Sequence, residues 1–158
     1  MAEKFRANEL LECAVQIEKN GEAFYRAAAG SVKDAKVKEL FGMLADEEVK
    51  HAETYSDMLK SVETYEPKEV YPDEYFAYLK AYADEHIFVK KEEVEKKASA
   101  VKSDVAAIDM AIGAEKDSIL YYLEMKNFVP AAEKPVIDKV IEEERRHYNR
   151  LTGVKNSL

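Results

Sequence analysis

The sequence predicts an all-α fold, an antiparallel four-helix bundle made of two helix pairs joined by a long crossover. Its 158 residues include only five glycines and four prolines, so few positions interrupt regular structure. Apolar side chains recur at spacings of three and four along four separate stretches, which is the period of an amphipathic helix. We expect a single domain over residues 1–158, an ordinary length for one hydrophobic core.

The first helix pair is expected over about residues 6–60. Its two apolar stripes contain Leu11, Ala14, Val15, Tyr25 and Ala28, and then Val37, Leu40, Phe41, Leu44, Tyr55 and Met58. Ser31 and Asp34 lie between the stripes. Both are candidate caps for the second helix, because their side-chain oxygens can accept a hydrogen bond from a backbone N–H.

The second helix pair is expected over about residues 103–155. Its stripes contain Val105, Ile108, Ile112, Ile119 and Tyr122, and then Ile137, Val140 and Leu151. Pro135 is compatible with a helix only in the first turn, where its missing N–H has no helical partner to lose. We therefore expect the last helix to begin between Ala131 and Pro135.

A long crossover, about residues 61–102, connects the two pairs. Pro67 and Pro72 break its beginning, and four tyrosines at helical spacing then predict one short extra helix. They are Tyr71, Tyr75, Tyr78 and Tyr82, and we expect them to pack against the bundle or a second subunit. The charged run 90–97 is expected to be a solvated helical face. Two antiparallel pairs joined in this way resemble the topology of ferritin-like bundles.

Charge and composition exclude several classes of function. The net charge of −8 argues against binding to nucleic-acid phosphates or to an anionic membrane surface. No apolar run approaches the length of a membrane span, and the first fifteen residues are charged rather than apolar like a secretory signal. Cys13 is the only cysteine, which excludes an intramolecular disulfide, a thiolate iron–sulfur cluster and a four-cysteine zinc site. We expect a cytoplasmic protein.

Glutamates and histidines interrupt the apolar stripes at matching heights. The six residues are Glu18, Glu48, His51, Glu115, Glu144 and His147. Each stripe carries one glutamate, and two of the glutamates are followed three residues later by a histidine. Residues three apart share a helix face, so such a pair can reach one metal ion. Counted from the turns at about 1.5 Å per residue, the four positions lie at one level of the bundle.

Four buried carboxylates would repel one another, and each is costly to bury unless it is paired or bound to metal. Two divalent cations neutralise four negative charges, and two neutral imidazoles complete the ligand set. We therefore predict a bimetallic site with these six residues as ligands. The alternative is that His51 and His147 are ordinary core histidines. His86 falls outside the pattern, and we expect it at the surface.

An internal repeat supports the metal site. At an offset of 97, Glu18, Lys19 and Tyr25 match Glu115, Lys116 and Tyr122; at an offset of 96, Glu47, Glu48 and His51 match Glu143, Glu144 and His147. Each half therefore contains a Glu-x6-Tyr helix followed by a Glu-Glu-x-x-His helix. Two lone glutamates plus two Glu-x-x-His pairs are the ligand inventory of di-iron and di-manganese carboxylate bundles.

With these motifs the sequence resembles rubrerythrin-like di-iron carboxylate proteins of the ferritin superfamily over nearly its whole length. The similar segments are IEKNGEAFY, LADEEVKH, AIGAEKDSILYY and IEEERRH. The resemblance implies two iron ions bridged by Glu48 and Glu144. It also implies that Glu18 and Glu115 are terminal ligands, one on each metal, and that the remaining ligands are His51 and His147.

The resemblance also implies roles for two tyrosines. Tyr25 and Tyr122 lie two helical turns beyond Glu18 and Glu115, where a tyrosine in this family hydrogen-bonds a ligand carboxylate. Without the repeat, both tyrosines would be interpreted as plain core aromatics, and that alternative stays open.

Two further glutamates are expected to orient the imidazoles. By the same resemblance, Glu47 would hold the His147 ring and Glu143 the His51 ring across the bundle. Such contacts fix which ring nitrogen carries the proton.

The sequence departs from the family pattern at two points. Rubrerythrins carry an extra glutamate three residues after the third-helix ligand, and here that position is Ser118. Glu22, one turn beyond Glu18, could substitute as a mobile seventh ligand; the alternative is a solvent-facing or hydrogen-bonded side chain. Rubrerythrins proper also carry a four-cysteine rubredoxin-like module. This sequence ends at Leu158, so we expect a separate electron-donor protein.

Three functions are compatible with these patterns. We rank first a non-haem di-iron oxidoreductase that reduces hydrogen peroxide, with Glu22, Tyr25 and Tyr122 as candidate catalytic residues. The second is a ferroxidase or iron-storage protein that uses O2, since the acidic charge attracts Fe²⁺. The third is a helical interaction protein whose buried polar residues only specify register. Manganese, or a mixed iron–manganese pair, suits the same ligands. The tyrosine-rich crossover favours a homodimer.

Overall fold

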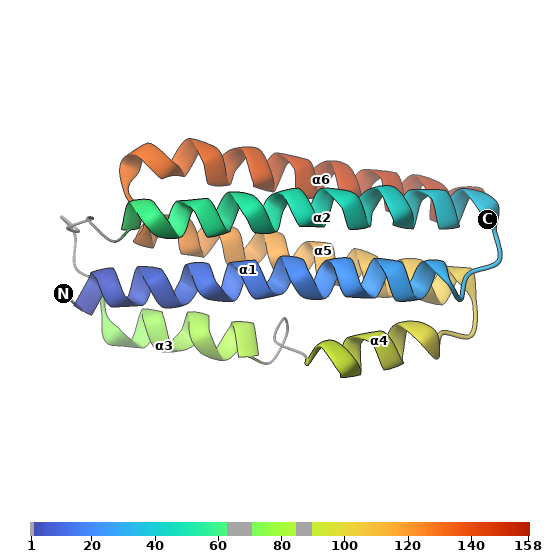
Figure 1. Ribbon diagram of the computed structural model, residues 1–158, viewed down its shortest axis with the longest axis horizontal. Helices are drawn as coiled ribbons and strands as arrows, with labels where there is room; N and C mark the ends of the chain where they lie inside the picture. The colour runs from blue at the N-terminus through green and yellow to red at the C-terminus, as the bar shows by residue number, and fades with distance from the viewer. Residues whose placement is uncertain (1, 63–70, 85–89) are drawn as a thin grey trace.

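The computed structural model describes residues 2–62, 71–84 and 90–158. Two antiparallel helix pairs form a four-helix bundle (Figure 1). The first pair is α1 (Ala2–Ala29) and α2 (Ala35–Val62), and the second is α5 (Asp104–Met125) and α6 (Lys134–Ser157). Two 3₁₀ turns, η2 (Lys126–Phe128) and η3 (Ala131–Glu133), connect the second pair. The described residues contain no strand, so the predicted all-α bundle is confirmed.

The described part of the crossover contains two short helices, where the sequence predicted one short extra helix. These are α3 (Asp73–Tyr82) and α4 (Lys91–Ser99). α4 contacts α1 and α3 contacts α5, and both run along the same side of the bundle (Figure 1). Only Ala98 of α4 is buried, so the charged run is an exposed helical face as expected. Pro67 and His86, about which the sequence made predictions, lie outside the described residues.

Of the four tyrosines expected to pack, Tyr71, Tyr75 and Tyr82 contact the bundle, whereas Tyr78 is 59% exposed. The rings of Tyr71 and Tyr75 lie 5.1 and 5.2 Å from that of Phe128. The Tyr82 hydroxyl donates a hydrogen bond of 3.0 Å to Asp117 on α5. These contacts attach the crossover to the second helix pair.

The helix starts follow from side-chain caps. The Asp34 carboxylate accepts hydrogen bonds from the backbone N–H groups of Lys36 and Val37, at 2.8 and 3.2 Å, so Asp34 caps α2 as predicted. The prediction for Ser31 is wrong. Its hydroxyl lies directly after the end of α1 and donates to the Ala27 carbonyl of the preceding turn instead. α6 begins at Lys134, inside the predicted window.

One contact joins the ends of the two helix pairs. The Asp104 carboxylate, at the start of α5, accepts hydrogen bonds from the backbone N–H groups of Lys33 and Asp34 at 2.9 and 2.8 Å. Ser103 caps α5 by accepting from the Ala106 N–H at 3.0 Å. Because the α1–α2 loop is held at the first residue of α5, the relative height of the two pairs is set at this end.

The apolar core is divided into two clusters along the bundle axis. One includes Leu10, Leu11, Met58, Tyr121 and Ile141, and the other includes Phe24, Phe41, Leu44, Ile108 and Leu151. The four buried glutamates lie between the two clusters, so apolar packing encloses them at both ends. They are Glu18, Glu48, Glu115 and Glu144. None of the helices in the described part of the chain has both the length and the apolar character that a membrane span requires.

Candidate metal centre

The middle of the bundle holds one glutamate from each long helix and one histidine from each of α2 and α6. Each of these residues is at most 4% exposed to solvent. They are Glu18, Glu48, His51, Glu115, Glu144 and His147. The structure therefore brings together all six residues that the sequence predicted as ligands.

The six side chains form two overlapping groups. Within each group, one possible ligand atom per residue lies within 4.8 Å of all the others. One group is Glu18, Glu48, His51 and Glu144, and the other is Glu48, Glu115, Glu144 and His147. Glu48 and Glu144 belong to both groups. This geometry suits two adjacent metal ions that share two carboxylates.

Both imidazoles turn the same nitrogen toward the carboxylates. The Nδ1 atom of His51 lies 2.8 Å from Glu144 Oε1 and 3.5 Å from Glu18 Oε2. The Nδ1 atom of His147 lies 3.4 Å from Glu115 Oε1 and 3.5 Å from Glu48 Oε1. The two rings are stacked, with centroids 5.7 Å apart. One Nδ1 atom is thus available to each group.

The outer nitrogen of each imidazole is held by a glutamate from the other helix pair. His51 Nε2 lies 2.6 Å from Glu143 Oε2, and His147 Nε2 contacts Glu47 Oε2. The two contacts predicted for Glu47 and Glu143 are therefore present. A carboxylate at Nε2 favours the tautomer with its proton there, which leaves the Nδ1 lone pair for a metal ion.

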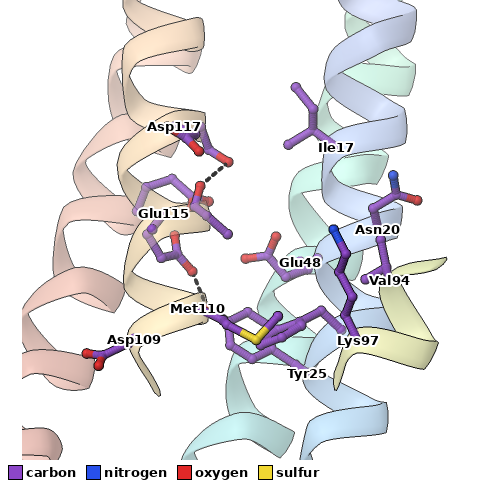
Figure 2. A pocket seen from close by; sticks show the side chains of 16 residues that line it. Ile17, Asn20, Tyr25, Glu48, Val94, Lys97, Asp109, Met110, Glu115 and Asp117 are labelled. Atoms are coloured by element: carbon purple, nitrogen blue, oxygen red, sulfur yellow. Dashed lines mark hydrogen bonds between the residues drawn. The ribbon is translucent and has the colours of Figure 1, made fainter. Parts of the chain in front are cut away.

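Two tyrosines donate hydrogen bonds to Glu115 and Glu18 across the bundle. The Tyr25 hydroxyl donates to Glu115 Oε1, and the Tyr122 hydroxyl donates to Glu18 Oε1, each at 2.5 Å. Figure 2 shows Tyr25 below Glu115, with Glu48 facing both. Burial, followed by the charges of nearby glutamates, raises the pKa of both tyrosines well above its usual value. Both hydroxyls therefore keep their protons at neutral pH and act as donors.

Several buried atoms of the cluster lie close to one another but form no hydrogen bond of acceptable geometry among the described residues. They are Glu18 Oε2, Glu48 Oε1, His51 Nδ1, Glu115 Oε2, Glu144 Oε1 and His147 Nδ1. A buried polar atom left unpaired costs about 1–3 kcal/mol, and more when it is charged. All six atoms belong to residues of the two ligand groups, and oxygen and imidazole nitrogen are donors that divalent iron and manganese accept. The residues present fit two metal ions.

The pKa shifts of the cluster show the same excess of negative charge. Burial, together with the charges of neighbouring glutamates, raises the pKa of Glu48 and of Glu144 well above the usual value. Burial opposes protonation of His51, but Glu18 and Glu143 outweigh it and raise its pKa to about 9. Burial also favours neutral Glu115, yet its contacts with Glu144, His147 and Tyr25 lower its pKa. Without metal, protons supply part of the missing positive charge.

Comparison with known proteins identifies the family. The sequence matches the rubrerythrin family over residues 9–155, which is most of the chain. The chain belongs to the rubrerythrin family. Among curated proteins, none matches the sequence significantly.

One solved structure resembles this rubrerythrin-family chain along nearly its whole length. It is the crystal structure of a protein from Thermotoga maritima described as a ferritin-like diiron-carboxylate protein. The two sequences are 25% identical, the match covers 95% of this chain and 94% of the other, and the TM-score is 0.68. The ferritin-like bundle predicted from the sequence is thereby confirmed.

The third predicted catalytic residue, Glu22, lies outside the buried cluster. Its carboxylate accepts a hydrogen bond of 2.8 Å from Arg26 Nε, and its side chain is 32% exposed. It lines a depression on the α1–α2 face that also includes Glu18 and Glu48. Of the two alternatives for Glu22, the structure shows the hydrogen-bonded side chain, and it places this side chain at the solvent side of the site.

Ser118 is one of the two points at which the sequence departs from the expected family pattern. It is buried, and its hydroxyl donates to the Ala114 carbonyl one turn earlier on α5 at 2.9 Å. Ser118 therefore turns toward its own helix and supplies no carboxylate to this rubrerythrin-family centre.

Tyr55 is a residue of the site that the sequence analysis assigned only to the apolar stripe. Its side chain is fully buried, its ring lies 5.0 Å from that of Tyr122, and its hydroxyl has no hydrogen-bond partner among the described residues. Burial and the charges of Glu18 and Glu144 raise its pKa well above the usual value. Tyr55 lies one turn beyond His51 on the same helix, which could have indicated a role at the site. The internal repeat gave no support for that role, because the matching residue of the other half is Leu151.

Gly21 is a second residue whose role needed the structure. A Cβ atom added to Gly21 would lie 2.5 Å from Glu48 Oε2, closer than two such atoms can approach. Only glycine leaves room for the Glu48 carboxylate in its present position. The internal repeat pairs Gly21 with Ser118, so the close approach belongs to one half alone.

Proposed function

We propose that this rubrerythrin-family protein is a non-haem di-iron oxidoreductase that reduces hydrogen peroxide with electrons from a separate donor protein. The observation that carries the proposal is the pair of overlapping ligand groups that share Glu48 and Glu144. The likeness to a diiron-carboxylate protein supports iron as the metal, while manganese suits the same donor atoms.

The ligand assignment follows from which group each residue belongs to. Glu48 and Glu144 would be shared by the two ions because each lies in both groups, whereas Glu18 and Glu115 each lie in one and would each serve one ion. The imidazoles of His51 and His147 complete the two groups through Nδ1. Four carboxylates and two divalent ions give a neutral cluster, which is the condition for burying it.

The reaction proposed is H2O2 + 2e⁻ + 2H⁺ → 2H2O. Bound iron would supply the change of oxidation state, and the chain supplies placement, charge balance and exclusion of water. Tyr25 and Tyr122 hold protons on their hydroxyl oxygens at the terminal carboxylates. Their raised pKa values prevent loss of those protons to solvent at neutral pH.

Glu22 is the carboxylate we propose for exchanging protons with solvent. It lines the same depression as Glu18 and Glu48 but is partly exposed, so it can take up a proton from water. Its hydrogen bond to Arg26 holds the carboxylate at this edge. The Glu22→Gln variant should therefore slow peroxide turnover while leaving the metal content unchanged, a result measured by steady-state kinetics and metal analysis.

Anaerobic stopped-flow spectroscopy tests the proposal. Protein loaded with two Fe²⁺ per chain is mixed separately with hydrogen peroxide and with O2, and the ferric absorbance is followed. Much faster oxidation by peroxide is the expected result. Faster oxidation by O2, with more than two irons consumed per chain, would instead indicate a ferroxidase or storage protein. No absorbance change with either oxidant would contradict a di-iron centre.

A further inference from the structure

A cavity of about 320 Å³ lies between α1 and α5 and extends to the metal-ligand cluster. Its inner end is formed by Glu48, Glu115 and Glu144. On the outer side α4 contributes Val94 and Lys97, which Figure 2 shows across the cavity from α5. The cavity therefore connects the solvent side of the crossover with the proposed metal centre.

Between these two ends the wall is mostly apolar. It is formed by Ile17, Gly21, Phe24, Met110, Gly113 and Ala114, together with the polar Asn20, whose Oδ1 accepts a hydrogen bond of 2.8 Å from Gln16 Nε2. Ser118 also lines it, but the Ser118 hydroxyl is already engaged with the Ala114 carbonyl. The wall thus offers van der Waals contact to a ligand and few free hydrogen-bonding groups.

The acidic residues near the cavity mouth already have partners outside it. Asp109 forms an ion pair of 2.7 Å with Lys155, and Asp117 accepts the hydrogen bond from Tyr82. In Figure 2 the Asp109 carboxylate points away from Glu48. The mouth therefore places no unpaired carboxylate from α5 in the path of a neutral, apolar molecule.

The volume of the cavity exceeds what hydrogen peroxide requires. At roughly 30 Å³ for each water-sized group, it has room for about ten non-hydrogen atoms, whereas hydrogen peroxide has two. Volumes above about 300 Å³ with predominantly apolar walls are typical of sites for organic ligands. An apolar molecule that fills the space would remove its own surface and the side chains of Phe24 and Ile17 from water. Its binding would therefore gain a hydrophobic free energy that hydrogen peroxide cannot provide.

We infer that the cavity binds the apolar part of a small organic hydroperoxide and places its O–O group at the inner, carboxylate-lined end. The inference rests on the proposed peroxide-reducing function and names its substrate class. The reaction is ROOH + 2e⁻ + 2H⁺ → ROH + H2O. The O–O bond breaks and each oxygen takes up one proton; two Fe²⁺ ions held by the ligand groups would supply the two electrons in a single turnover, each becoming Fe³⁺.

Gly113 provides the test of this site. A Cβ atom added there meets nothing within 4 Å, so the helix has room for a side chain at this position, and we expect a leucine to extend into the cavity that Gly113 lines. Gly42 on α2 is the matched control, because an added Cβ also meets nothing within 4 Å and Gly42 does not line the cavity. Both changes replace a helical glycine by a better helix former.

The first measurement is binding without turnover. The zinc-loaded full chain is titrated with 2-phenyl-2-propanol, the alcohol product of cumene hydroperoxide, by ligand-observed NMR. We expect saturable binding that weakens at least tenfold in Gly113→Leu and is unchanged in Gly42→Leu. Absence of binding, or equal binding by both variants and the parent chain, overturns the inference.

The second measurement is the single-turnover rate with cumene hydroperoxide and with hydrogen peroxide on Fe²⁺-loaded protein. We expect the ratio of the two rates to fall at least tenfold in Gly113→Leu and to be unchanged in Gly42→Leu. Rapid oxidation by hydrogen peroxide with negligible oxidation by cumene hydroperoxide in the parent chain refutes the cavity inference alone. Failure of both oxidants refutes the proposed function itself.

Discussion

The two helix pairs are closely matched where they meet the proposed metals. In the first pair, Tyr25 of α1 donates a hydrogen bond to Glu115 of the second pair. In the second pair, Tyr122 of α5 donates to Glu18 of the first, at the same distance of 2.5 Å. The glutamate of each pair therefore accepts its tyrosine hydrogen bond from the other pair, so both hydrogen bonds cross the bundle.

The pairs differ in the residues that shape the space around the site. Gly21 on α1 lets the Glu48 carboxylate approach the helix backbone, whereas its counterpart Ser118 on α5 carries a side chain. Tyr55 on α2 is matched by Leu151 on α6. The two-fold repeat therefore holds at the charged residues of the site, and it breaks at Gly21 and Tyr55, which have Ser118 and Leu151 as their counterparts.

The largest effect is expected at the shared carboxylates, where the two pairs should be equivalent. Glu48→Ala and Glu144→Ala each remove a residue common to both ligand groups, so each variant should lose both metals. Metal content after dialysis, measured by mass spectrometry with helical content as the control for folding, provides the test. Retention of two metals per chain in either variant would refute the bridging assignment.

The next effect should distinguish the pairs. Gly21→Ala forces a methyl group to within 2.5 Å of Glu48 Oε2, so the carboxylate must move and metal affinity should fall at least tenfold. Ser118→Ala removes only a hydroxyl bonded to its own helix and should change the affinity less than twofold. Competition with a chromogenic chelator gives both affinities. Equal values for the two variants would mean that the close approach of Gly21 has no functional consequence.

The pH dependence of stability should reveal how protons replace the metals. The folded-state pKa of His51 is raised to about 9 from an unfolded value near 6.5, so its contribution of about 3 kcal/mol is fully present below pH 6.5 and is lost as pH rises through about 9. The raised pKa values of Glu48 and Glu144 act in the same direction above pH 4.5.

Urea unfolding of the metal-free chain at pH 6, 7.5 and 9 should therefore show falling stability as pH rises. The metal-loaded chain should show a much smaller change, because the ions replace the protons and binding releases them. A metal-free chain that becomes more stable between pH 6 and 9 would contradict this account of the cluster.

Sequence patterns predicted the site more completely than its surroundings. Glutamates and histidines recur at fixed helical spacing, and spacing on a helix determines which residues share a face; this is why Glu18, Glu48 and their counterparts could be placed at one level. The partners Glu47 and Glu143 followed from the same repeat and the resemblance. The spacing of these residues is a property of each helix alone, and the repeat gives both pairs the same spacing. Predicting the site therefore required no knowledge of distances across the bundle.

Features that depend on distances between helices could not be obtained in this way. The approach of Glu48 to Gly21 depends on how closely α1 and α2 pack, which no periodicity encodes. The sequence predicted one packed helix in the crossover and not the second, α4, because the charged run of α4 has almost no apolar stripe, with Ala98 its one buried residue. The cavity between α1 and α5 likewise arises from three helices at once.

The smallest effect concerns two adjacent tyrosines that differ only in whether the hydroxyl is used. Tyr122→Phe leaves a buried oxygen of Glu18 without its donor and should lower the stability of the metal-free chain by about 1–3 kcal/mol. Tyr55→Phe removes a buried hydroxyl that has no partner among the described residues, so stability should change by less than about 0.5 kcal/mol or increase. Urea unfolding of both variants, with Tyr25→Phe as the counterpart of Tyr122→Phe in the other pair, makes the comparison.

If Tyr55→Phe proved as destabilising as Tyr122→Phe, the Tyr55 hydroxyl would have to make a contact that the structure does not contain. If instead Tyr25→Phe and Tyr122→Phe lose equal stability while Tyr55→Phe loses none, the difference is one of pairing rather than of burial, because all three side chains are almost fully buried. That result would mean that the two helix pairs are equivalent in their tyrosine hydrogen bonds to the carboxylates. Tyr55, like Gly21, would then be a feature of the first helix pair alone.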